Sequence, residues 1–262
     1  MKLAVNYSTP LKNLIETNQV RVDLLKCPEW EGLVNPALEL GPVYIHFGIE
    51  LGSGSIQRLN FDLIKRMFEK TDTIYLNTHL SNLPSRKKDK TDSAKSVLSR
   101  WEADLEILRR KIPSRKVIAE NLPWHPMLPE LEIASDPGLI NKFLVNNDVG
   151  LLLDLSHAQI SATRLGIGYQ EYVSLLPLDR LRELHITGIR KYAGHQTDHF
   201  ELQPHDWHIV EWAASQIRSG AWHEPDIVAF EYGGVGDVFC WRTEPDALRQ
   251  QVPILYEMFG DK

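Results

Sequence analysis

Short apolar runs alternate with longer amphipathic segments along most of this chain. The apolar runs predict strands at residues 3–7, 20–25, 43–46, 73–79, 116–120, 150–154, 181–185 and 226–231. Between them, apolar residues at helical spacing predict helices at 60–69, 93–111, 136–146, 170–176, 207–219 and 244–259. Strands that alternate with helices pair in parallel, so the pattern predicts an α/β fold, a (β/α)8 TIM barrel.

Many of the predicted strands end in a side chain that can bind a metal ion. Buried strands consist mainly of aliphatic side chains, so a His, Asp or Glu where a strand stops needs a separate explanation. In a barrel the carboxyl ends of the strands and the loops that follow them form one face, which carries the active site. We therefore expect a shared metal site built from His46, His79, Glu120, Asp154, His185 and Glu231.

Three further residues complete this set of candidate ligands. His157 follows Asp154 in a D-x-x-H step, and Asp198 and His199 lie in the long segment 188–203, which we predict to be a loop at the rim. His195 or His205 could take the place of His199. Mixed imidazole and carboxylate donors suit zinc, iron or manganese, whereas calcium and magnesium prefer oxygen ligands.

The number of donors indicates more than one ion. Two carboxylates about 4 Å apart repel by roughly 4 kcal/mol at an effective dielectric constant of about 20, so acids that converge need protons or cations. A lone histidine at a strand end is more often structural, and an acid there often caps the next helix. That alternative weakens when many such groups fall on one predicted face, and the surplus predicts two or three ions.

Other residues of the predicted rim have candidate roles in binding or catalysis. Arg190 and Lys191 follow the seventh predicted strand and could meet a carboxylate or phosphate of a substrate. The segment 81–91 carries the charge run Arg86-Lys87-Lys88-Asp89-Lys90, which is either a solvated face or a rim that meets an acidic substrate. We predict catalytic roles for Glu120, Asp198 and Glu231.

Composition limits the remaining possibilities. The chain has 262 residues, a length that fits one α/β domain spanning 1–262. Its net charge of −6 argues against tight nucleic-acid binding, and the sequence has no apolar span long enough for a membrane, so we predict a cytoplasmic protein. Cys27 and Cys240 lie far apart in the sequence, so we expect packed thiols rather than a disulfide.

Several stretches around these residues also resemble a known superfamily. Glu120, Asp154, His185 and Glu231 match the recurring Glu, Asp, His, Glu metal core of the xylose isomerase-like TIM barrels. Within it, residues 43–259 are most similar to the multinuclear non-haem iron-dependent oxidative enzymes, many of which modify cysteine-containing ribosomal peptides. The resemblance is carried by Tyr44-Ile45-His46-Phe47-Gly48, Leu51-Gly52-Ser53, Ala119-Glu120-Asn121, Leu151-Leu152-Leu153-Asp154 through Ile160-Ser161-Ala162, Pro177-Leu178-Asp179-Arg180-Leu181, Glu183-Leu184-His185-Ile186-Thr187-Gly188 and Phe230-Glu231-Tyr232.

This resemblance implies an oxidase or oxygenase with two or three metal ions, iron being favoured over zinc or manganese. It implies a peptide substrate that contains a thiol, and a ferrous ion that binds O₂ beside a thiolate held by a neighbouring ferric ion. His46, His79 and Glu120 would hold one ion, with Glu120 and Asp198 as bridging ligands. The other candidate ligands would complete the remaining ions.

The sequence departs from that family at three places. His157 stands where the family commonly has Asn, Ile189 stands where it has His, and Asp198-His199 replaces an Asp-x-His step. The D-x-x-H step resembles instead endonuclease IV, which implies a zinc-dependent phosphodiester hydrolase as an alternative. A mononuclear sugar isomerase or epimerase would leave His46, His79 and His157 without a role. A barrel that stores metal or binds peptide without turnover is the non-catalytic alternative.

Overall fold

A computed structural model of the chain describes residues 1–82, 93–124, 129, 131–192, 194–234 and 243–261. Within it the chain forms two compact units. The first unit comprises Met1–His46, Lys70–Thr73 and Glu183–Lys262, and the second comprises Phe47–Glu69 and Ile74–Arg182. That 1–262 is a single domain stays a prediction.

Buried parallel strands form the centre of the first unit. Their side chains are almost entirely buried, which explains why the sequence shows apolar runs rather than alternation. The register places Ala4 opposite both Leu24 and Ala229 on its two neighbours. The hydrogen-bonded order is β3 (Val43–Ile45), β2 (Leu24–Cys27), β1 (Lys2–Asn6), β11 (Ile227–Phe230) and β8 (Leu181–Ile186).

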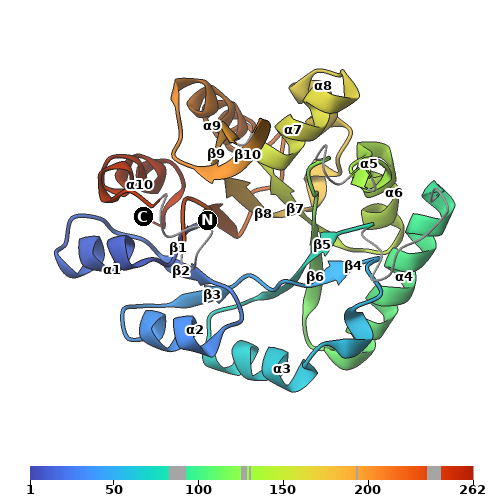
Figure 1. Cartoon of the computed structure of the whole chain (residues 1–262), viewed down its shortest axis with the longest axis horizontal. Coiled ribbons are helices and arrows are strands. Elements are labelled where there is room, and N and C mark those ends of the chain that lie inside the picture. Colours follow the sequence, from blue (N-terminus) through green and yellow to red (C-terminus); the bar gives the residue numbers. More distant parts are fainter. Residues whose placement is uncertain (83–92, 125–128, 130, 193, 235–242, 262) are drawn as a thin grey trace. The chain divides into compact units, whose positions relative to one another are not determined.

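Helices α1 (Thr9–Glu16), α2 (Glu31–Leu38), α9 (Pro204–Arg218) and α10 (Pro245–Phe259) also belong to the first unit. Helix α10 packs on β1 and on α1, its neighbour in Figure 1, while α2 packs on β2 and β3. Neither α1 nor α2 is among the helices that the sequence pattern predicts. Helix α1 begins at a clear capping signal, because Ser8 Oγ accepts a hydrogen bond from the backbone N–H of Leu11 at 3.2 Å.

The predicted loop at 188–203 is wrong in part, because most of this segment is a β-hairpin. Strand β9 (Gly188–Tyr192) pairs antiparallel with β10 (His195–Phe200). A Cβ atom on Gly188 would lie 2.0 Å from the carbonyl oxygen of Glu201, so the close approach of the two strands requires glycine there. The hairpin thus gives Asp198 and His199 a fixed backbone.

The second unit repeats the parallel strand and helix pattern. Its strands lie in the order β7 (Gly150–Asp154), β6 (Lys116–Glu120), β5 (Tyr75–Leu80) and β4 (Glu50–Leu51). Helix α4 packs against α6, which lies beside it in Figure 1. Between these helices, the ring of Trp101 meets that of Phe143 edge to face, with 5.3 Å between the centroids. The helical elements are η1 (Ile56–Arg58), α3 (Phe61–Lys70), α4 (Ala94–Lys111), α5 (Leu131–Ala134), α6 (Pro137–Asn146), α7 (Leu155–Leu165), α8 (Tyr169–Ser174) and η2 (Leu178–Arg180).

The α/β class that we predict is confirmed, and each predicted strand corresponds to a strand of the structure. The second strand begins at Leu24 rather than at residue 20, and the short strand β4 is an addition. A closed eight-stranded barrel stays a prediction. Helix α7 escaped the sequence analysis because it begins directly where β7 ends, so Asp154 closes the strand and caps the helix.

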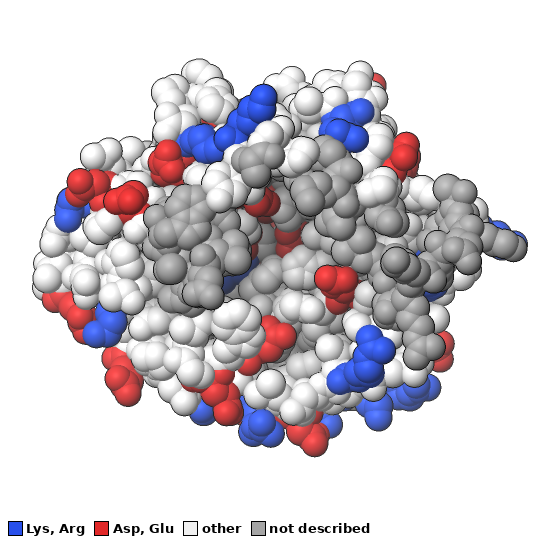
Figure 2. Space-filling model, in the orientation of Figure 1, with Lys and Arg blue, Asp and Glu red and all other residues white. Residues whose placement is uncertain are grey.

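The face of the molecule seen in Figure 2 carries charged side chains of both signs. In Figure 2 acidic and basic side chains are interspersed over the visible face, and neither sign gathers into one extended patch among the residues that are coloured. No helix among the described residues is long and apolar enough to cross a membrane. Cys27 is a free, buried thiol, whereas Cys240 and the charge run at 86–90 lie outside the described residues.

Candidate metal site

Three strands of the first unit bring three of the predicted ligands together. His46 directly follows β3, His185 lies near the end of β8, and Glu231 directly follows β11. Each residue offers one donor atom, and these atoms all lie within 4.8 Å of one another. The rings of His46 and His185 are 5.2 Å apart between centroids. Parallel pairing puts these strand ends at one edge of the sheet, as the sequence pattern indicates.

His185 is fully buried, and acidic side chains flank its ring. Its Nδ1 lies 3.3 Å from Glu231 Oε2, and its Nε2 lies 2.8 Å from Glu183 Oε1. Glu183 and His185 are two residues apart on β8, so their side chains point to the same face of the sheet. The Tyr44 hydroxyl donates a hydrogen bond to Glu183 Oε2. Glu183 therefore holds His185 from the side away from Glu231.

A lysine completes this cluster, and the sequence analysis missed it together with Glu183 and Tyr44. Lys26 lies in β2 with only 3% of its surface exposed. Its Nζ contacts Glu231 Oε1, lies 2.7 Å from His185 Nε2 and lies 3.9 Å from Glu183 Oε1. Lys26 and Glu183 interrupt apolar runs inside strands, and that interruption is the signal that could have revealed them.

Opposing effects act on the pKa of Glu231. Burial by itself raises this pKa, but the neighbouring charges of His185 and Lys26 outweigh burial and hold it well below its ordinary value. Glu231 is therefore a carboxylate throughout the neutral pH range. An ionised carboxylate beside two imidazoles is a donor set that fits a divalent cation.

The hairpin residues differ in how they relate to Glu231. His199 has a backbone φ of +60°, and its Nδ1 donates to the Glu231 carbonyl oxygen at 2.9 Å, which leaves Nε2 as its acceptor nitrogen. His205 pairs with Asp206 at 3.3 Å. This geometry favours His199 over His205 as the loop ligand. Asp198 is half-buried in β10, and its role as a ligand stays a prediction.

The two basic residues that we predict to bind substrate also lie on the hairpin. The guanidinium of Arg190 pairs with Asp206 at 3.1 Å and with Glu201 at 3.3 Å. The side chain of Lys191 is exposed. Arg190 is thus engaged inside the protein, and Lys191 is the more accessible of the two cations. A substrate-binding role for either stays a prediction.

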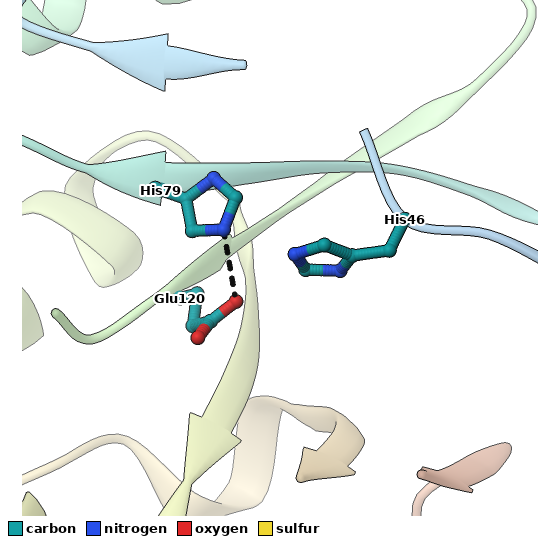
Figure 3. A group of neighbouring side chains, drawn as sticks. All are labelled: His46, His79 and Glu120. Carbon is teal, nitrogen blue, oxygen red and sulfur yellow. Dashed lines mark ion pairs between the residues drawn. The ribbon is translucent and has the colours of Figure 1, made fainter. Parts of the chain in front are cut away.

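The second unit gathers its own group of predicted ligands. Glu120 ends β6, Asp154 ends β7 and His157 lies in the first turn of α7, and one donor atom of each lies within 4.8 Å of the others. His79 is paired in register with Glu120, and its Nε2 lies 3.4 Å from Glu120 Oε2. Figure 3 shows the ring of His79 facing this carboxylate.

Local hydrogen bonds fix the predicted ligands of the second unit. Asp154 Oδ1 accepts the backbone N–H of His157 at 2.7 Å, and Asp154 exchanges backbone hydrogen bonds with the Asn121 amide at 2.9 and 3.1 Å. His157 Nδ1 lies 2.9 Å from the Asn121 carbonyl oxygen and 3.1 Å from Glu120 Oε1. A histidine whose Nδ1 proton is held by such acceptors has the lone pair of Nε2 available for a metal ion.

The chemistry of both groups fits a metal ion. Each combines buried carboxylate oxygen with imidazole nitrogen, the mixture that zinc, iron and manganese accept. In the second unit Glu120 and Asp154 are only 2% and 0% exposed, and a carboxylate oxygen of one lies within 4.8 Å of a carboxylate oxygen of the other. Two buried carboxylates this close repel each other, and a bound cation would offset that repulsion. That all nine predicted ligands share one site stays a prediction.

Three similarities relate the chain to known proteins. UPF0276 protein AM1_3026 of Acaryochloris marina (strain MBIC 11017) is 26% identical over 216 residues, which cover 78% of this chain and 71% of the relative. A crystal structure of D-psicose 3-epimerase in the presence of D-fructose superposes with a TM-score of 0.62 at 11% identity, covering 100% of both chains. Endonuclease IV from Thermus thermophilus gives a TM-score of 0.56 at 12% identity over 98% of both chains.

The two structural likenesses show that the fold is shared, and at such low identity they show nothing about the reaction. The family assignment comes from the sequence. The family described as "RiPP precursor modification enzyme MbnB/TglH/ChrH" matches residues 32–222, a range that includes every predicted ligand except Glu231. The chain therefore belongs to this family of enzymes that modify precursor peptides.

Proposed function

We propose that this chain is a multinuclear metal enzyme that oxidises a thiol-containing precursor peptide, with iron as its metal and dioxygen as the oxidant. The observation that carries the proposal is that each unit brings together a donor group of its own, His46, His185 and Glu231 in one unit and Glu120, Asp154 and His157 in the other. A mononuclear enzyme has no use for the second group. Membership of a family that modifies precursor peptides supports a peptide as the substrate.

The residues of each group have distinct tasks in this proposal. In the second unit Glu120 and Asp154 supply negative charge, and the rings of His79 and His157 lie beside Glu120, with His157 supplying Nε2 as its donor atom because its Nδ1 faces Glu120 and the Asn121 carbonyl oxygen. In the first unit His46, His185 and Glu231 hold a further ion, and His199 and Asp198 complete the set. When bound, iron supplies one-electron chemistry and an affinity for thiolate sulfur. Glu120, Asp198 and Glu231 are the proposed catalytic carboxylates.

The two residues that we propose to contact the substrate, Arg190 and Lys191, lie on the β9–β10 hairpin. Lys191 is exposed on β9, so its ammonium can meet a carboxylate of the peptide. Arg190 is tied to Asp206 and Glu201, and it would reach a substrate only by leaving these partners. Lys191 is therefore the first residue to test for a contribution to peptide affinity.

The decisive experiment is metal analysis of protein purified without oxygen, followed by oxygen-uptake measurements with thiol peptides. Two or three iron ions per chain, oxygen consumption that needs the peptide thiol, and an absorption band on thiol addition would support the proposal. The same peptide with serine in place of cysteine is the control. Zinc alone, together with cleavage of phosphodiesters and no oxygen uptake, would sink it.

A zinc-dependent phosphodiester hydrolase is the second candidate, and His157 is the observation that favours it. The D-x-x-H step places His157 beside Asp154 and Glu120, and this arrangement resembles endonuclease IV, whose fold the chain shares. Bound zinc would lower the pKa of a water molecule to about 7. Cleavage of a model phosphodiester by the zinc-loaded protein tests this candidate directly.

A further inference from the structure

The first-unit group, formed by His46, His185 and Glu231, has a cation of the protein itself beside it, the ammonium of Lys26. Lys26 reaches into it from β2, on the far side of β1 from the strand that carries Glu231. Its ammonium contacts Glu231 Oε1 directly and lies 3.9 Å from Glu183 Oε1, and all three side chains are at least nine-tenths buried. Buried charges persist only where they are paired, so the two carboxylates explain why a lysine is stable here.

Lys26 also competes for the ring of His185. The Nε2 atom of His185 lies 2.7 Å from the Lys26 ammonium, which can only donate, and 2.8 Å from a Glu183 oxygen, which as a carboxylate can only accept. A ring nitrogen of neutral imidazole serves one of these partners and not both. The position of Lys26 therefore influences which nitrogen of His185 carries the proton.

The two tautomers differ in their ability to bind an ion. When Nε2 donates to Glu183, Nδ1 turns its lone pair toward Glu231 Oε2, 3.3 Å away, and the two atoms can share a cation. When Nε2 accepts from Lys26 instead, Nδ1 carries the proton and neither nitrogen is available. Only the first arrangement turns His185 into a ligand.

We propose that Lys26 is a positioning residue that restrains metal binding by the first-unit group. Its ammonium takes Glu231 Oε1 and competes for His185 Nε2, so that an ion enters only through His185 Nδ1 and Glu231 Oε2. This inference rests on the proposed function, because it assumes that His46, His185 and Glu231 bind an ion. It predicts that Lys26, a cation of the protein itself, lowers the affinity of the first-unit group for a metal ion.

The test is to titrate the metal-free full-length protein with manganese(II) and to measure free manganese by electron paramagnetic resonance. A Glu120→Ala background removes a ligand of the second-unit group, so that binding reports on the first unit. Lys26→Met removes the charge with little change of length, and Lys26→Gln keeps a donor for Glu231. The matched control is Lys12→Met, a lysine of the same unit that pairs with Glu16 at the surface.

We expect Lys26→Met to bind manganese at least about tenfold more tightly than the parent, which corresponds to about 1.4 kcal/mol. Lys26→Gln should shift in the same direction, and Lys12→Met should not shift. Without metal, Lys26→Met should melt at a lower temperature than the parent, and manganese should raise its melting temperature by more. A purely structural role for Lys26 would weaken both stability and binding, which is the opposite outcome for affinity.

Two failures can be told apart. If the wild-type protein binds no divalent cation at all, the proposed function is overturned and this inference with it. If the wild-type protein binds manganese, but neither Lys26 variant binds it more tightly, only the role of Lys26 is overturned. Should Lys26→Met not fold, Lys26→Gln carries the test. Long-range NMR of ¹⁵N-labelled histidine gives a second readout, since removing Lys26 should move the His185 proton from Nδ1 to Nε2.

Discussion

The two units use the same kinds of donor in different electrostatic settings. In the first unit Glu231 lies between the imidazole of His185 and the ammonium of Lys26, whereas in the second unit Glu120 lies between the imidazoles of His79 and His157. An internal ammonium already compensates part of the carboxylate charge in the first unit. Similar ligand residues can therefore differ widely in their attraction for a cation, because the surrounding charges enter the binding free energy.

The largest effect is expected when Glu120 of the second unit is removed. Glu120→Ala deletes the carboxylate that both His79 and His157 contact, so we expect metal to be lost from the second unit and peptide oxidation to cease. Metal content measured by mass spectrometry after anaerobic purification checks this. Glu106→Ala, an exposed position on α4, is the control and should keep its metal. Unchanged metal content in Glu120→Ala would show that the site is elsewhere.

A smaller effect is expected when His157 is replaced by Asn, the residue that the resembling family commonly has there. Asn is shorter and offers only an amide oxygen, so affinity of the second unit should fall about tenfold or more, or about 1.4 kcal/mol. Calorimetric titration with zinc and with iron measures the loss for each metal. His208→Asn, on the exposed surface of α9, is the control. Retained peptide oxidation with lost phosphodiesterase activity would favour iron chemistry.

The pH dependence of stability tests the electrostatic setting of Glu231 in the first unit. Because His185 and Lys26 hold the pKa of Glu231 below its ordinary value, Glu231 stabilises the fold above pH about 4.3, the pKa of an unperturbed glutamate. This stabilisation is lost as the pH falls toward the lower pKa of the folded state. Urea unfolding of the metal-free protein between pH 3 and 6 measures this effect. The free energy of unfolding should depend less steeply on pH for Glu231→Gln than for Glu211→Gln. Equal slopes would contradict the assignment.

Cys27 gives the smallest effect, and it reports on the first unit alone. Burial raises the pKa of this thiol to about 12, whereas an unfolded cysteine ionises near pH 8.5. Its contribution to stability is therefore intact below pH 8.5 and decreases as the pH rises toward 12. Between pH 8 and 9.5 we expect the free energy of unfolding, measured with urea, to fall by about 1 kcal/mol more for the wild-type protein than for Cys27→Ala.

The same thiol tests metal binding in a Cys240→Ala background. Cys27 follows Lys26 on β2 and is only 1% exposed, so a thiol reagent reaches it only when the first unit opens. Manganese should slow this labelling if the first-unit group binds it. Labelling that is insensitive to the metal, while the second unit is loaded, would place the bound ion in the second unit only.

The residues of the candidate site could largely be picked out from the sequence because most of these candidate ligands lie at strand ends. A strand end is visible in the sequence as the point where an apolar run stops, and parallel strands bring such points to one edge of a sheet. Glu120, Asp154, His185 and Glu231 follow this rule. The hairpin of β9 and β10 could not be predicted in the same way, because antiparallel pairing of short polar strands has no apolar pattern.

Local periodicity and residue chemistry were enough to predict the α/β class, the buried strands and the kinds of donor atom at their ends. Which of these donors meet, and which other side chains lie beside them, depends on how the strands are arranged in space. Lys26 and Glu231 are 205 residues apart and come from strands on either side of β1, so their contact depends on strand order rather than on any local pattern. Charge interactions act through space, and the order of the strands sets the distances over which they act.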